Sequence, residues 1–178
     1  MKCTLSIFLL SILTFGCSKN DFENTNLYLA FDKEAYQPND NFELTVRIYP
    51  TETKKTIRLY KDLNNFEFAF FPKEGQLGFK EVLNERFIQG PSLTGYDSEY
   101  IDEFTITEKK PYEKKLLGTI YELENEILFE IPEMKIKDRI DKSILYENPT
   151  VLVKGNCRTV YGIEGKTFEP KEIKVVLE

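Results

Sequence analysis

Apolar and polar residues alternate along much of the chain, beginning near residue 27. The clearest example is 42–49, in which four apolar residues alternate with Glu43, Thr45 and Arg47. A period of two indicates a β-strand with one buried face. The pattern therefore predicts a sheet protein, and shorter stretches of the same kind lie at 27–31, 56–60, 66–71, 103–107, 127–131, 151–160 and 173–177.

Turn-forming residues separate these stretches. Pro38, Asn39 and Asp40 precede the strand at 42–49; proline fixes φ, and asparagine tolerates the left-handed region. Helical spacing is sparse. Several short alternating strands with turns between them predict an antiparallel β-sandwich or barrel. Three segments lack the alternating pattern. Residues 78–87 predict one or two helical turns or an edge strand, and residues 134–144 are weakly helical. Residues 88–100 are typical of a long loop.

The first seventeen residues differ in composition from the rest. An apolar stretch at 5–15 follows Lys2, and Gly16 and Cys17 then precede a polar stretch at 18–26. An apolar run of about 11 residues is too short to span a hydrocarbon core, which needs about 20. It has the dimensions of the apolar segment of a secretory leader, which ends in a small residue before the cleavage point. A simple secretory leader with an incidental cysteine is the alternative.

The position of Cys17 makes this N-terminus resemble the lipobox of bacterial lipoproteins. In that family the leader is removed before the cysteine, whose sulfur carries a diacylglycerol and whose new amino group is usually acylated. The usual pattern has leucine three residues before the cysteine, where this chain has Thr14. The resemblance implies that Cys17 is lipidated and that the protein is exported to a membrane. In such lipoproteins an aspartate after the cysteine signals retention at the inner membrane. Because Ser18 follows Cys17 here, the resemblance implies the outer membrane, on its periplasmic or surface face.

These signals divide the chain into a leader at 1–16, a lipidated N-terminus with a short flexible tether at 17–26, and a β-domain at 27–178. Removal of the leader takes away one lysine, so 23 basic and 30 acidic residues remain, with a net charge of −7. Cys3 leaves with the leader. With Cys17 lipidated, Cys157 has no partner for an internal disulfide. We expect Cys157 to be a small buried apolar residue and not a nucleophile.

Composition argues against several classes of function. The net charge of −6 disfavours nucleic-acid binding, which rests on lysine and arginine. The chain has no histidine, which removes Ser-His and Cys-His catalysis and His-ligated zinc. It has neither a phosphate-binding glycine motif nor a Cys-x-x-Cys pair. We therefore expect no cofactor and no enzymatic activity, while catalysis by paired carboxylates alone stays open.

Two charged segments are candidate sites. Residues 97–103 hold four carboxylates around Tyr100, close to Tyr96. Such a composition suits calcium or a sugar, but the order of a calcium loop is missing and a solvated surface is typical of such runs. Residues 109–115 hold four lysines around Tyr112. This segment is typical of a solvated turn that protects a strand edge, and contact with anionic lipid headgroups or an acidic partner is the alternative.

Residues 32–40, DKEAYQPND, are similar to the opening of macroglobulin-like and related immunoglobulin-like bacterial domains. In that family an Asp-Lys-x-x-Tyr-x-Pro-Gly-(Asp/Glu) stretch links the first two strands. Here Asn39 replaces the glycine, which is tolerable where φ is positive. The resemblance implies an immunoglobulin-like β-sandwich. The Cys-Gly-Glu-Gln thioester of large macroglobulins is missing from this sequence, so that activity is not implied.

Loop tyrosines are the candidate partner contacts, because tyrosine is enriched at interfaces; they are Tyr96, Tyr100 and Tyr112. We predict a lipid-anchored protein of the cell envelope whose domain is a non-enzymatic module that binds a protein or a glycan. An inhibitor or immunity protein acting on a toxin or protease is the alternative, because charge steers a small acidic domain to basic enzymes. A carboxylate hydrolase is a third hypothesis, and it requires two acidic side chains about 5–9 Å apart in a pocket.

Overall fold

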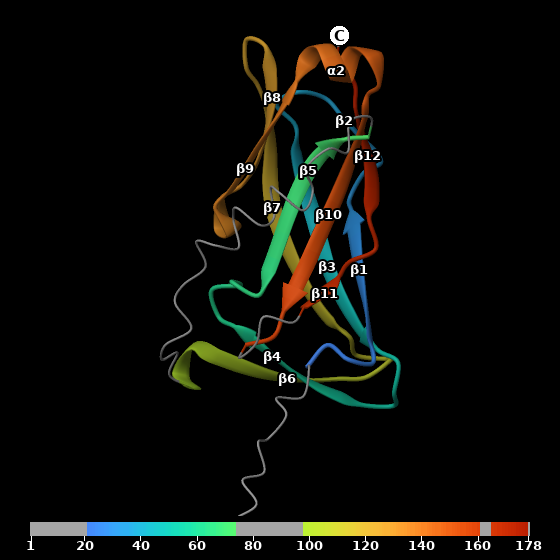
Figure 1. Cartoon of the computed structure of the whole chain (residues 1–178), viewed down its shortest axis with the longest axis vertical. Coiled ribbons are helices and arrows are strands. Elements are labelled where there is room, and N and C mark those ends of the chain that lie inside the picture. The colour runs from blue at the N-terminus through green and yellow to red at the C-terminus, as the bar shows by residue number, and fades with distance from the viewer. Residues whose placement is uncertain (1–20, 74–97, 161–164, 178) are drawn as a thin grey trace, which may run out of the picture.

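The computed structural model describes residues 21–73, 98–160 and 165–177. Within these residues the protein is all-β, and nearly all of its strand pairs are antiparallel. Two five-stranded sheets face each other across an apolar core, and a two-stranded ribbon crosses one end of the molecule (Figure 1). This arrangement is consistent with the predicted β-sandwich.

The first sheet has the strand order β1-β3-β7-β8-β9 and is antiparallel throughout. The second has the order β11-β10-β12-β2, and β5 pairs with the other side of β10. Its short β2–β12 pair is parallel. The strands of the first sheet are β1 (Thr25–Phe31), β3 (Asn41–Pro50), β7 (Tyr112–Glu122), β8 (Glu126–Ile131) and β9 (Ile136–Asp141). Those of the second are β2 (Ala35–Tyr36), β5 (Phe66–Pro72), β10 (Thr150–Arg158), β11 (Gly165–Thr167) and β12 (Lys171–Val175).

The ribbon and three short helical turns complete the described elements. The ribbon pairs β4 (Lys55–Tyr60) with β6 (Ile101–Ile106). The helical turns are η1 (Ser98–Tyr100), η2 (Pro132–Met134) and α2 (Lys142–Glu147). The strands predicted from alternation are confirmed in β1, β3, β4, β5, β6, β8, β10 and β12. Residues 78–87 and most of the loop at 88–100 lie outside the described residues.

Two predictions about local structure need correction. The lysine-rich segment 109–115 is the predicted solvated turn only at its start, where Thr107 bridges Lys110, because Tyr112 begins β7, which lies between β3 and β8. The segment 134–144 is mostly not helical, because it holds β9, and a helix begins only at Lys142. The buried Asp138 occupies the inward position of β9 between Ile136 and Ile140, so the alternation was hidden in the sequence.

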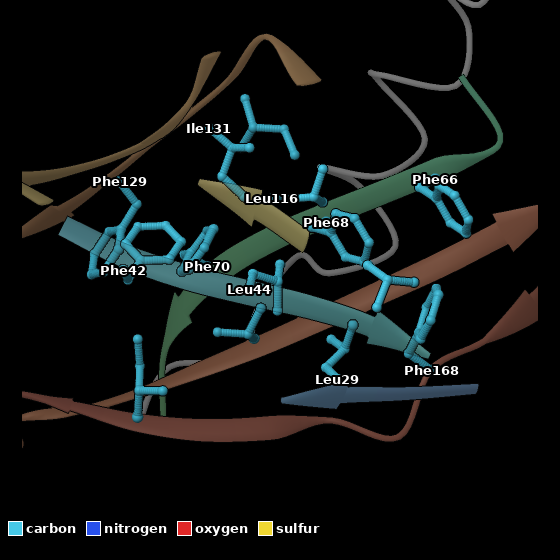
Figure 2. Packing of buried hydrophobic residues seen from close by; sticks show 14 of the residues in the cluster. Leu29, Phe42, Leu44, Phe66, Phe68, Phe70, Leu116, Phe129, Ile131 and Phe168 are labelled. Carbon is cyan, nitrogen blue, oxygen red and sulfur yellow. The ribbon is translucent and has the colours of Figure 1, made fainter. Parts of the chain in front are cut away.

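Phenylalanine rings join the two sheets. Phe70 of β5 stacks on Phe129 of β8 with ring centroids 4.7 Å apart, and it meets Phe42 of β3 edge-on at 5.7 Å. Figure 2 shows these three rings gathered in one region of the core. Offset or edge-to-face aromatic pairs stabilise a core beyond the area that they bury. The two sheets are thus held by contacts between strands that are far apart in the sequence.

Two glycines make room for rings of this core. Gly118 pairs with Phe42 in the β3–β7 register, and a Cβ placed on Gly118 would lie 2.1 Å from Cζ of Phe42. Gly155 pairs with Phe68 in the β5–β10 register, and its Cβ would lie 2.5 Å from the Phe68 ring. A ring lying over a cross-strand glycine fills the space that the missing side chain leaves. These positions therefore exclude even alanine without movement of the phenylalanine.

The DKEAYQPND stretch at 32–40 connects β1 to β3 and contains the short β2. The Tyr36 hydroxyl donates to Asp32 Oδ1 at 2.8 Å, and the Glu43 N–H donates to the same oxygen at 2.7 Å. Asn39 has φ of 70°, as expected where asparagine replaces glycine. Partial burial raises the pKa of Asp32, but these hydrogen bonds outweigh it, so the net pKa lies below its ordinary value. The motif therefore fixes the geometry of a strand connection.

Candidate functional site

The ribbon of β4 and β6 is the region that carries the sequence-predicted contact residues. It crosses the lower end of the molecule in Figure 1, below the two sheets. Its inner side contributes Ile57, Leu59 and Ile106 to the hydrophobic core. Its other residues are mainly polar, and many are exposed. The ribbon is thus a single layer whose charged side chains have access to solvent or to a partner.

Tyr100 lies at the end of the ribbon where β6 begins. Its side chain is 53% exposed, and its carbonyl oxygen accepts a hydrogen bond from the Lys61 N–H at 3.0 Å. Glu99, Asp102 and Glu103 are exposed around it. Lys61 Nζ reaches Asp102 at 3.9 Å, a long contact between two half-exposed groups that does little to neutralise this end. An exposed aromatic ring in an acidic setting is therefore present as the sequence predicted.

Tyr112 lies in a different environment. It is half-buried and packs against the core, with its ring 5.0 Å from Phe104 and 6.2 Å from Phe66. Burial raises the pKa of Tyr112 to about 12. The structure therefore places Tyr100 on the exposed surface and Tyr112 at the junction between ribbon and sheets. Tyr96 and Cys17, the other predicted site residues, lie outside the described residues.

The N-terminal segment of the described chain holds the ribbon in place. Arg58 of β4 donates from Nη2 to Asp21 Oδ1 at 2.8 Å and from Nε to Asp21 Oδ2 at 3.0 Å. Asp21 is buried, and the neighbouring Phe22 is fully buried in the core. The Thr51 N–H donates to the Asn24 carbonyl at 2.8 Å. Residues 21–26, which the sequence assigned to the flexible tether, are therefore part of the folded domain.

A buried asparagine links the other end of β4 to the second sheet. Asn65 is fully buried; its Oδ1 accepts from the Tyr60 N–H, and its Nδ2 donates to the Arg158 carbonyl at 2.7 Å. The Arg158 N–H donates in turn to the Asn65 carbonyl at 2.8 Å. Leu63 adopts φ of 62° in the same turn. These polar contacts fix the direction in which the ribbon leaves the sheets.

Four lysines gather at the opposite end of the ribbon from Tyr100. Lys55 pairs with Ile106, so the turn before β4 and the turn after β6 lie beside each other. The second turn is closed by a bridge between Thr107 and Lys110. Sequence reasoning named only one of these turns, because the β4–β6 register decides that they are neighbours. The lysines are Lys54, Lys55, Lys109 and Lys110, and all but the half-buried Lys55 are exposed.

Cys157 is buried, as the sequence predicted. Its side chain is fully buried in β10, and burial raises the pKa of its thiol well above the ordinary value. A thiol in this state is a poor nucleophile. Among the described residues, no group of three or more acidic or cysteine side chains is placed to hold a metal ion. None of the helices in the described part of the chain has the length and hydropathy to cross a membrane.

The described residues define an all-β protein with antiparallel sheets and a charged ribbon at one end. Comparison with protein-family models, with curated proteins and with solved structures finds no match to this chain.

Proposed function

We propose that this protein is an exported lipoprotein of the cell envelope, held at the outer membrane by acyl chains on Cys17. The observation that carries the proposal is the apolar stretch at 5–15 followed directly by Gly16 and Cys17. The fold is compatible with it, because removal of residues 1–16 leaves every described core residue in place, beginning with Phe22. One acyl chain binds a membrane reversibly, whereas several on one cysteine give a stable anchor.

The domain, in this proposal, is a non-enzymatic module that binds a protein or a glycan through the Tyr100 end of the ribbon. Tyr100 offers a large exposed ring, and tyrosine is enriched at interfaces. The exposed carboxylates of Glu99, Asp102 and Glu103 give this surface a negative charge. Complementary charge accelerates association, so a protein with a basic surface is the partner favoured here.

An immunoglobulin-like or macroglobulin-like identity for the sandwich is part of the same proposal. It is supported by the connection at 32–40, in which Asp32 accepts from both Tyr36 and Glu43. It is also supported by the positive φ of Asn39 at the position where that family has glycine. A β-sandwich of this kind is a common scaffold for recognition modules outside the cytoplasm.

An inhibitor or immunity protein is the second candidate, and the acidic character of the Tyr100 surface favours it. Such a protein would cap the active site of a basic toxin or protease, guided by charge. The two candidates share a surface and differ in the partner. Inhibition of the captured protein's activity by the purified domain would select the second candidate over the first.

The anchor is tested on the protein made in its own envelope. Mass spectrometry of the native product should give a chain that begins at Cys17 and carries acyl mass. A Cys17→Ala variant should lose partitioning into the detergent phase. An intact leader, or an N-terminus without acyl mass, would contradict the anchor.

The binding surface is tested by capture from envelope extracts with residues 18–178, which contain all described core residues. Tyr100→Ala should abolish capture of the partner, because it removes the exposed ring. Tyr146→Ala is the matched control, since Tyr146 of α2 is 63% exposed at the other end of the molecule (Figure 1). Equal capture by the two variants would show that the partner binds elsewhere.

A further inference from the structure

The ribbon has opposite charge at its two ends. One end carries Lys54, Lys55, Lys109 and Lys110, and the other carries Glu99 and Asp102 around Tyr100. The register separates them, because Lys55 pairs with Ile106 while Tyr60 pairs with Ile101. Strands of six residues span about 20 Å at about 3.3 Å per residue, which is longer than the Debye length at physiological salt. A charged surface near the ribbon can therefore attract one end and repel the other, because the two ends are screened from each other.

The distance from the lipidated residue to this ribbon is short. Asp21 is fixed on Arg58 by two hydrogen bonds, and four residue steps separate it from Cys17. A fully extended chain covers at most about 3.6 Å per residue, which gives about 14 Å. An anchor at Cys17 therefore holds the ribbon end of the domain next to the lipid headgroups. The end that carries α2 lies away from them (Figure 1).

We propose that the lysine end of the ribbon docks on the anionic headgroups of the membrane that carries the anchor, which turns the acidic Tyr100 end away from the headgroups and toward a partner. This inference rests on the proposed lipid anchor at Cys17. The anchor sets the distance between the domain and the membrane, and the ribbon charges set the orientation of the domain on the membrane surface.

The four lysines are suited to this contact. Within the described residues, the structure gives none of them an ion pair. Of the two carboxylates on the same turns, Glu52 accepts from the Asn24 amide and Glu108 is exposed. The two turns, 51–55 and 107–110, keep a net charge of +2 in a chain of net charge −6. Each lysine near an anionic surface increases membrane partitioning about fivefold.

The other end of the ribbon is repelled by the same surface. Glu99, Asp102 and Glu103 are exposed, and the Lys61–Asp102 contact is long. Like charges separated by less than a Debye length of about 8–10 Å raise the free energy of an approach. The Tyr100 end is thus lifted from the headgroups while the lysine end rests on them.

The experiment uses tryptophan as a position probe, because the chain has no tryptophan of its own. Residues 17–178 are coupled through the Cys17 thiol to a maleimide lipid in vesicles, so that anchoring does not depend on processing in a cell. Cys157 is fully buried and does not compete for the maleimide. Three single variants, Thr53→Trp, Tyr100→Trp and Tyr146→Trp, are compared by quenching from a spin label on the headgroups.

On phosphatidylglycerol vesicles we expect quenching of Thr53→Trp to exceed that of Tyr100→Trp at least twofold, with none for Tyr146→Trp. On phosphatidylcholine vesicles the first two should become equal. Adding Lys109→Glu and Lys110→Glu to either probe should remove the difference, while the matched pair Lys137→Glu and Lys174→Glu, on β9 and β12, should keep it. Equal quenching of Thr53→Trp and Tyr100→Trp on anionic vesicles would overturn the proposal.

Different experiments test this inference and the lipid anchor, so the failure of one can be distinguished from the failure of the other. The vesicle result depends only on the ribbon charges, because the maleimide lipid supplies the anchor. The mass of the native protein depends only on processing at Cys17. Circular dichroism of each variant before coupling verifies that the charge changes, which lie on exposed turns and strand faces, leave the fold intact.

Discussion

The two-sheet body and the β4–β6 ribbon are stabilised in different ways. In the body, both faces of the core are apolar, and rings such as Phe42, Phe70 and Phe129 interlock between sheets. The ribbon buries only one side and depends on polar contacts, chiefly Asp21 with Arg58 and the amide of Asn65. Area buried from water dominates folding, whereas one charged contact contributes little by comparison. The body therefore sets stability, and the ribbon is free to present charge.

One buried carboxylate nevertheless stabilises the body, and another holds the ribbon in place. In the body, Asp138 of β9 reaches across to the edge of the second sheet, where its Oδ2 accepts from the Phe70 N–H at 3.0 Å. Beside the ribbon, Asp21 of the N-terminal segment accepts both hydrogen bonds from Arg58 of β4. The Asp138 contact joins the two sheets, and the Asp21 contact joins the ribbon to the N-terminal segment of the described chain. Mutations in the two regions should therefore differ in size and in how far their effects spread.

Phe68→Ala should have the largest effect. The ring is fully buried, packs 5.5 Å from Phe168, and covers Gly155. Its removal leaves a cavity that the sheets cannot close, so we expect a loss of about 3–5 kcal/mol in the free energy of unfolding. Urea denaturation measures the loss. A loss below about 1 kcal/mol would mean that this core is not tightly packed.

Asp138→Ala should come next, with a loss of about 3 kcal/mol. The change leaves the Phe70 N–H without its acceptor in a buried setting, and desolvation of an unpaired polar group is costly. Asp138→Asn is the matched control, because an amide oxygen can still accept this hydrogen bond. If the asparagine variant is as unstable as the alanine variant, the hydrogen bond is not what this residue supplies.

Arg58→Ala should cost about 1–2 kcal/mol, with a local result. Loss of the Asp21 contact frees the ribbon from the N-terminal segment, and charge-assisted hydrogen bonds contribute modestly where one partner is partly exposed. Hydrogen exchange should rise in β4 and β6 and stay unchanged in β3 and β7. Lys137→Ala, which removes the ion pair between the exposed Lys137 and Glu130, should change stability by less than about 0.5 kcal/mol. Faster exchange throughout would show that ribbon and body unfold together.

Tyr112→Phe should have almost no effect at neutral pH and a clear effect in alkali. Burial raises the pKa of Tyr112 to about 12, so the folded state favours the neutral phenol. The stabilisation is complete below the unfolded-state pKa of about 10 and is lost as the pH rises from 10 to 12. The variant should keep its stability better across that interval, as followed by thermal melts. Identical pH profiles would mean that Tyr112 ionises freely.

The sequence predicted where most strands lie better than it predicted which strands pair with one another. The alternation at 42–49 was sufficient for β3, and the turn chemistry at Asn39 anticipated its positive φ. The alternation did not reveal β7, because Lys114 occupies an inward position in the row that continues through Leu116, Gly118 and Ile120. It failed for β9 because a buried aspartate replaced an apolar residue. Both failures occur where a partner far away in the sequence supplies the favourable contact.

The sequence by itself determines the local features of this chain. The spacing of apolar side chains decides which stretches are strands, the apolar stretch before Cys17 predicts a leader, and the composition leaves the chain without histidine chemistry. Tertiary structure alone brings Lys54 and Lys55 beside Lys109 and Lys110 and buries Asp138 at a sheet edge. Such pairings depend on strand register between distant segments, and that register follows from burial over the whole domain.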